Sequence, residues 1–63
     1  MNTLIGIKGA IEDEGYSSAV FTLQREAKFH DNWVLRDKAG TFIDTDAYRV
    51  PLAYRNNLEL REI

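Results

Sequence analysis

Few residues of this sequence have the types and the spacing that enzyme chemistry requires. Cysteine is absent and His30 is the one histidine, which excludes a thiol–imidazole pair and a zinc site built from cysteine or several histidines. Ser17 and Ser18 do not lie in a nucleophile-elbow sequence. A chain of 63 residues also has little room for a deep pocket that would shift the pKa of a catalytic carboxyl group. We therefore expect a protein that is not an enzyme and that uses no cofactor.

Two acidic clusters have the charge to bind cations or basic partners. Asp44-Thr45-Asp46 offers the oxygen ligands that Mg²⁺ prefers, but a dedicated site needs more ligands and the rest of a calcium-loop pattern is missing. We interpret this cluster as a helix cap or a solvated turn. Glu12-Asp13-Glu14 has the charge to dock a basic partner, and we interpret it as a solvated turn between strands. No metal site is predicted.

The stretch 47–57 has the composition most typical of a binding surface. A Tyr-Arg pair occurs twice in it, at 48–49 and 54–55, with no acidic residue between the pairs. Tyrosine and arginine dominate binding hot spots, and they also stack on nucleobases and contact phosphates. The alternative is that both tyrosines pack in the core and the arginines pair with acidic side chains. Together with a predicted hairpin, the stretch predicts a partner-binding surface formed by Trp33, Arg36, Tyr48, Arg49, Tyr54 and Arg55.

The size and charge of the chain limit what kind of protein it is. We expect residues 1–63 to form a single small domain with a thin core, and such a domain is usually stabilised by a disulfide, a metal or a partner subunit. Without cysteine or a metal site, self-association remains, so we expect a homodimer. The absence of cysteine, of a signal sequence and of a long apolar segment favours a cytoplasmic protein without a membrane anchor.

The first segment, 3–12, has an ambiguous pattern. As a strand it places Ile5, Ile7 and Ile11 on one face, and as a helix it aligns Leu4 with Ile7 and Ile11. Two interior glycines disfavour the helix by about 1 kcal/mol each, and they are typical of a bent or closely packed strand. We predict a strand over 3–12, followed by a turn at Asp13-Glu14-Gly15.

Alternation with a period of two is clearest from Ser17 to Phe29. Apolar side chains occupy most odd positions and polar ones most even positions, which predicts a half-buried strand, although a helical pattern is also present. After a polar break at 30–32, the strands Trp33–Arg36 and Thr41–Asp44 flank Asp37-Lys38-Ala39-Gly40. This tetrad predicts a hairpin turn with Gly40 in the left-handed conformation.

The C-terminal third contains the one proline of the chain, Pro51. Because proline is favourable at a first helical position, we predict a short helix over 51–56, with Asn57 as its left-handed cap. A rival interpretation begins this helix at Asp44 or Asp46 and accepts a kink at Pro51. The segment 58–63 alternates apolar and charged residues, which predicts a closing strand.

These elements predict a mainly β fold: a five-stranded SH3-like barrel or meander sheet, with a short helix before the last strand. The alternative is an α+β domain with a three-stranded antiparallel sheet and helices at both ends. For function we expect a non-catalytic protein-interaction module, an accessory or regulatory protein that docks on a larger protein, as small proteins of phages and mobile elements often do.

Two other functions remain open. One is a nucleic-acid-binding barrel that uses the aromatic and arginine residues named above. A net charge of −2, with eight basic and ten acidic residues, does not favour binding to a polyanion. The other is a structural protomer in which the second strand or the closing strand pairs with a copy of itself.

Overall fold

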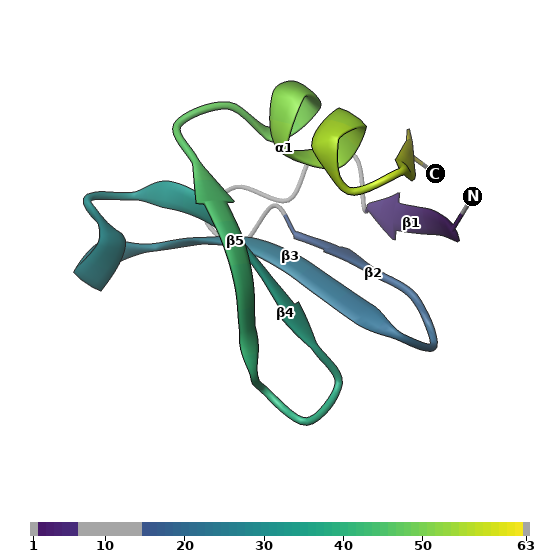
Figure 1. The fold of residues 1–63 in the computed structure, drawn as a ribbon, viewed down its shortest axis with the longest axis horizontal. Helices are drawn as coiled ribbons and strands as arrows, with labels where there is room; N and C mark the ends of the chain where they lie inside the picture. The colour runs from purple at the N-terminus through teal and green to yellow at the C-terminus, as the bar shows by residue number, and fades with distance from the viewer. Residues whose placement is uncertain (1, 7–14, 63) are drawn as a thin grey trace.

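The computed structural model describes residues 2–6 and 15–62 of the chain. Strands account for most of this backbone (Figure 1). The prediction of a mainly β fold with a short helix before the last strand is confirmed. The elements are β1 (Asn2–Gly6), β2 (Tyr16–Ser17), β3 (Phe21–Glu26), the 3₁₀ helix η1 (Ala27–Phe29), β4 (Asn32–Asp37), β5 (Phe42–Asp46), α1 (Arg49–Arg55) and β6 (Leu58–Glu62).

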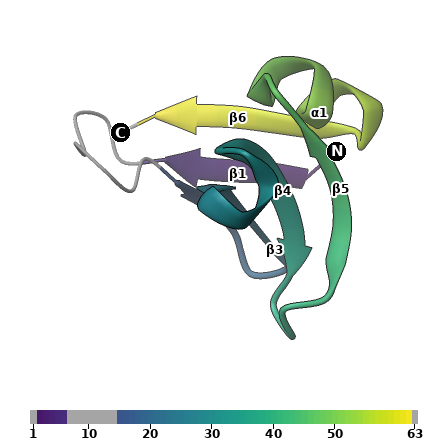
Figure 2. The same cartoon turned by 90° about the vertical axis from the view of Figure 1, so that its left-hand side faces the viewer.

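All of these strands belong to one sheet, in the order β5-β4-β3-β2-β1-β6. Neighbouring strands are antiparallel except β1 and β6, which are parallel and pair from Asn2 with Leu58 to Gly6 with Glu62. The sheet curls, and α1 contacts both of its edge strands, β5 and β6 (Figures 1 and 2). The result is a half-barrel of SH3-like outline, as predicted. The alternative with an N-terminal helix is wrong, because residues 2–6 form a strand.

The core lies between the concave side of the sheet and α1. Leu52 of the helix is completely buried, and so are leucines from β1, β3 and β4. Phe21 and Leu60 are partly buried and pack against the edge of this core. The buried members of the cluster are Leu4, Tyr16, Leu23, Trp33, Leu35, Leu52, Ala53 and Leu58.

The predicted strand over 17–29 is divided in two, so the sheet has six strands instead of five. The Ser18 hydroxyl accepts hydrogen bonds from the backbone N–H groups of Val20 and Phe21, each at 3.1 Å, and the resulting turn separates β2 from β3. The second half of the prediction fails at Glu26, where the chain enters η1. His30 and Asp31 follow in the left-handed conformation, each with φ of 59°.

The prediction for the first segment is partly wrong. Leu4 is buried in the core, whereas Ile5, which we expected to face the core, is 37% exposed. A closely packed strand is confirmed at Gly6, which lies against the Tyr16 ring. Residues 7–12 of the predicted strand lie outside the described residues. So do the first two residues of the predicted turn at 13–15.

The hairpin and the C-terminal elements are confirmed with small shifts in their ends. The Asp37 carboxylate accepts hydrogen bonds from the N–H groups of Ala39 and Thr41, and Gly40 has φ of 90°. Helix α1 begins two residues before Pro51, which places the proline in the first turn, where its missing N–H costs no helical bond. Asn57 has φ of 56°, as predicted for a left-handed cap. The rival start at Asp44 or Asp46 is wrong, because both residues lie in β5.

The contact between Gly6 and Tyr16 gives a first prediction. A Cβ atom at position 6 would lie 2.6 Å from Cε2 of the Tyr16 ring, which is part of the core. We expect Gly6→Ala to lower the free energy of unfolding by about 1–3 kcal/mol, measured by urea denaturation, because the ring must move. Gly15→Ala is the matched control. Its Cβ would meet Gln24, an exposed side chain that is able to move aside. Equal effects of the two substitutions would contradict this account.

Candidate interaction surface

Helix α1 turns most of its side chains away from the protein. Leu52 and Ala53 are buried under it, whereas Val50 is 66% exposed and Tyr54 is 85% exposed. Tyr48, which precedes the helix, is 72% exposed. Its backbone N–H donates a hydrogen bond of 3.0 Å to the Asp46 carboxylate, which fixes the entry into the helix. We call Val50 and Tyr54 the outer face of α1.

An apolar groove runs between α1 and β6. It has a volume of about 280 Å³ and is lined by Val50, Ala53, Tyr54, Leu58 and Leu60. The described residues that form its walls include no Asp, Glu, Lys, Arg or His side chain. The groove is therefore suited to apolar side chains and not to acid–base chemistry.

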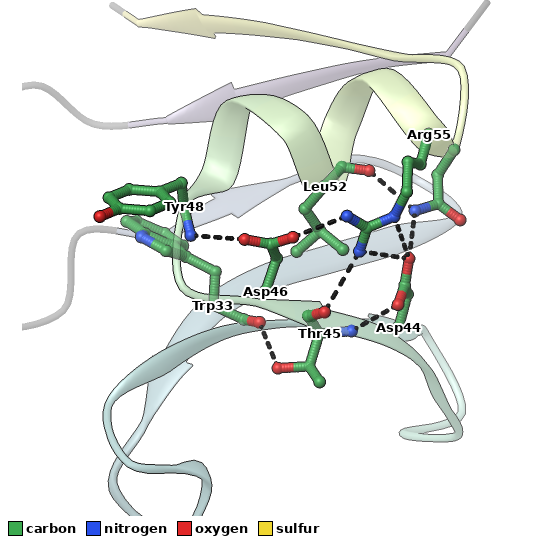
Figure 3. A network of polar contacts seen from close by, with 8 residues as sticks. Trp33, Asp44, Thr45, Asp46, Tyr48, Leu52 and Arg55 are labelled. Carbon is green, nitrogen blue, oxygen red and sulfur yellow. Dashed lines mark hydrogen bonds and ion pairs between the residues drawn. The ribbon is translucent and has the colours of Figure 1, made fainter.

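The position of α1 is fixed by a polar network at its C-terminal end (Figure 3). The Arg55 guanidinium donates to the carboxylates of Asp46 at 2.6 Å and Asp44 at 3.0 Å, and to the Thr45 carbonyl at 3.2 Å. Asn56 also donates to Asp44, at 3.0 Å. The network ties the helix to the edge of β5.

These contacts favour the ionised form of both carboxyl groups. The hydrogen bond from Asn56 lowers the pKa of Asp44 below its ordinary value, with further contributions from the Thr45 N–H and from Arg55. The hydrogen bond from Arg55 lowers the pKa of Asp46, together with the backbone N–H of Tyr48. The acidic cluster that we interpreted as a cap or a turn therefore binds an arginine of the same chain.

A second cluster surrounds Trp33 at the N-terminal end of α1. The guanidinium carbons of Arg25 and Arg49 each lie 5.7 Å from the centroid of the Trp33 ring, a distance typical of a cation–π contact. The Arg49 Nε also donates a hydrogen bond of 3.1 Å to the Tyr16 hydroxyl. The Trp33 ring is 6% exposed and belongs to the core. Arg25 and Arg49 thus cover the part of the core that Trp33 forms.

Arg36 lies in a third environment. Its guanidinium makes two hydrogen bonds to the Glu26 carboxylate, at 2.8 and 2.9 Å, and one to the Gly40 carbonyl. It also lies 5.9 Å from the centroid of the Phe29 ring, which stacks on Phe42. The hydrogen bond from Arg36 lowers the pKa of Glu26. These contacts of Arg36 join the region of η1 to the β4–β5 hairpin.

The structure therefore divides the six residues that the sequence predicted as one surface. Tyr54 lies on the outer face of α1 and Tyr48 is exposed just before the helix, so their predicted packing in the core, the alternative, is wrong. Arg49 lies between this face and Trp33, which is buried. Arg36 and Arg55 are held by carboxylates of the same chain, as the alternative expected.

The sequence analysis missed the apolar part of the surface. Val50 and Tyr54 are four residues apart, a spacing that places two side chains on one face of a helix, but the helix predicted over 51–56 left Val50 out. The groove residues Leu58 and Leu60 were predicted as a strand, but nothing in the sequence placed that strand beside α1. Arg25 was missed because its contact with Trp33 depends on the pairing of β3 with β4.

Two further features bear on function. Among the residues that the structure describes, no cluster of three or more histidine or acidic side chains has the arrangement of a metal site. The one α-helix within 2–6 and 15–62 is too short to cross a membrane.

Comparison with known proteins gives no further guide: no family model, curated protein or solved structure matches this chain.

The Arg55 network predicts how stability depends on pH. A lowered pKa in the folded state means that the ionised carboxylates of Asp44 and Asp46 stabilise the fold. This contribution is fully present above the unfolded pKa of about 4 and is lost as the pH falls through the folded pKa. We therefore expect the urea midpoint to fall steeply below about pH 4.

A pair of variants tests the origin of this loss. Arg55→Met should lower the midpoint at pH 7 and flatten its dependence on acidic pH, because the cation that favours the carboxylates is removed. Lys38→Met is the control, since Lys38 is exposed in the turn between β4 and β5 and lies outside this network. An unchanged acid profile in Arg55→Met would contradict this assignment.

Proposed function

We propose that this chain is a non-catalytic protein-interaction module that docks on another protein through the outer face of α1 and the adjoining groove. The observation that carries the proposal is the exposure of Val50 and Tyr54, which line an apolar groove, together with the exposure of Tyr48 just before the helix. Tyrosine is among the residues enriched in binding hot spots, and contiguous exposed apolar surface marks interaction sites.

The stability of the fold does not require tyrosine or valine at these exposed positions. Tyr54 and Tyr48 are exposed by 85% and 72%, so they contribute little buried area to the core. A helix that only covered the core would stabilise the protein equally well with polar residues at these positions. Two tyrosines and a valine on the outside are better explained by contact with another molecule.

The distribution of charge favours a protein over a nucleic acid as the partner. Two of the arginines that would contact phosphates, Arg36 and Arg55, already donate to carboxylates of the same chain. A phosphate would have to compete with these carboxylates, on a chain whose net charge is −2. The apolar lining of the groove also matches a side chain better than a nucleotide.

The proposal of a non-catalytic role rests on the same surface. The carboxyl groups whose pKa is lowered, Glu26, Asp44 and Asp46, each bind an arginine and do not line the groove. A general acid or base would instead need a pKa near the working pH beside a substrate site. The groove supplies shape and apolar contact but no such group.

Substitution of Tyr54 tests the docking face. We expect Tyr54→Ala to keep the free energy of unfolding within about 0.5 kcal/mol of the parent, because the side chain is exposed. Affinity for the partner should fall about 30-fold or more, the effect of losing a hot-spot residue. The measurement is capture of partners from the native host by the immobilised chain, with quantitative mass spectrometry and titration of the captured protein.

Lys38→Ala is the matched control, because it is an exposed position in the β4–β5 turn, away from α1. This variant should retain the partner. A partner that binds both variants equally well would refute the proposed face. Binding of the parent to DNA or RNA at low salt, with steep loss as salt rises, would favour the nucleic-acid alternative instead.

A further inference from the structure

The two edges of the sheet differ in how they are protected against pairing with another strand. An edge strand presents backbone N–H and C=O groups that are able to pair with another chain, and proteins usually cover or charge such edges. At the β5 edge, the Arg55 guanidinium donates to the carbonyl of Thr45 and to the carboxylates of Asp44 and Asp46 on either side (Figure 3). A register shift at Leu35/Arg36 further distorts the pairing of β4 and β5. The β5 edge is therefore blocked.

The β6 edge lacks this protection within the part of the chain that the structure describes. The side-chain hydrogen bonds to backbone carbonyls that Arg36, Thr45, Arg55 and Asn56 donate all have acceptors outside β6. Two of the three charged residues of the strand, Glu59 and Arg61, pair with one another at 2.6 Å. Strand β6 runs along the side of the molecule with β1 on one side of it (Figure 2).

We propose that β6 pairs with β6 of a second copy of this chain, antiparallel and with Leu60 on the two-fold axis. The pairing would join two half-barrels into one continuous sheet. It makes an isologous interface, in which the same residues meet from both sides. The inference does not rest on the proposed docking function, because it is argued from β6 and its charges, although both proposals use the groove residues Leu58 and Leu60.

The register follows from the charges of the strand. In an antiparallel pair, side chains directly opposite each other must lie on the same face, so the symmetric registers of β6 are centred on residue 59, 60 or 61. Centring on Glu59 places glutamate against glutamate, and centring on Arg61 places arginine against arginine. Like charges directly opposite are destabilising, and opposite charges are stabilising. Centring on Leu60 places Glu59 against Arg61 twice, so this register alone is complementary.

On the other face of the strand, the same register places Leu60 opposite Leu60, and it places Leu58 opposite Glu62. Leu58 and Leu60 alternate with the charged residues and line the groove with Val50 and Tyr54 of α1. At the axis, Leu60 would meet Leu60 of the second copy, and the two grooves would lie next to each other. The pairing would thus add contacts between two chains to a small core. A domain of this size buries little apolar surface and usually needs such an additional source of stability.

Charge reversal tests the interface and its register together. Sedimentation of the parent chain from about 1 µM to about 1 mM should show a monomer–dimer equilibrium. Glu59→Arg and Arg61→Glu should each raise the dimer Kd about tenfold or more, because each places two like pairs across the axis. The double variant Glu59→Arg/Arg61→Glu should restore the dimer. An equimolar mixture of the two single variants should form a heterodimer, because all of its cross-strand pairs are opposite in charge.

Far-ultraviolet circular dichroism would show that each variant keeps its fold, which we expect because both side chains are exposed or partly exposed. A parent chain that stays monomeric over the whole concentration range would overturn the proposal. Dimers that persist in both single variants, or that the double variant fails to restore, would overturn it as well. Neither result would bear on capture of a different protein by Tyr48 and Tyr54.

A cysteine at the axis provides an independent test of the register. The chain has no cysteine, so Leu60→Cys introduces a single thiol that faces its own copy within reach of a disulfide. Mild oxidation should give a cross-linked dimer in high yield. Glu59→Cys is the control and should cross-link poorly, because residue 59 faces residue 61 of the second copy. Equal yields from the two positions would contradict the register centred on Leu60.

Discussion

The concave side of the sheet is open between β5 and β6, and the rest of the structure depends on how α1 closes it. The helix has seven residues, about two turns, so it offers few side chains to the core. Leu52 and Ala53 supply the contact with the leucines of the sheet. The other helical side chains are exposed, and of these Arg49 and Arg55 also contact residues of the sheet. A short helix that must cover a core therefore leaves an outer face, and this chain places tyrosine and valine there.

Polar contacts at both ends of α1 hold the helix over the opening. Arg55 and Asn56 bind Asp44 at one end, and Arg49 contacts Trp33 and the Tyr16 hydroxyl at the other. These arginines have a structural role that the sequence pattern did not distinguish from binding. The arginine of each Tyr-Arg pair positions the helix, and the tyrosine beside it is left exposed. The division of roles follows from which residues face the sheet.

Local signals in the sequence predicted the elements that depend on local physics. The β4–β5 hairpin, the short helix and its left-handed cap at Asn57 follow from turn residues, proline and glycine. Elements that depend on distant contacts were predicted less well. The direction in which Leu4 and Ile5 point is set by packing against Tyr16 and Leu58, and the break after Ser17 depends on one hydroxyl. The parallel pairing of β1 with β6, and hence the groove beside α1, had no signal in either segment alone.

We propose that, within residues 2–6 and 15–62, α1 and β6 are the places where this small fold presents surface for another chain. Amide hydrogen exchange of β6, compared with β5 at low and at high protein concentration, tests this claim most directly. The account predicts that the outward amides of residues 58–62 exchange rapidly when dilute and become protected when concentrated, while protection of residues 42–46 stays constant. Exchange in β6 that is already slow at low concentration and does not change with concentration would contradict it.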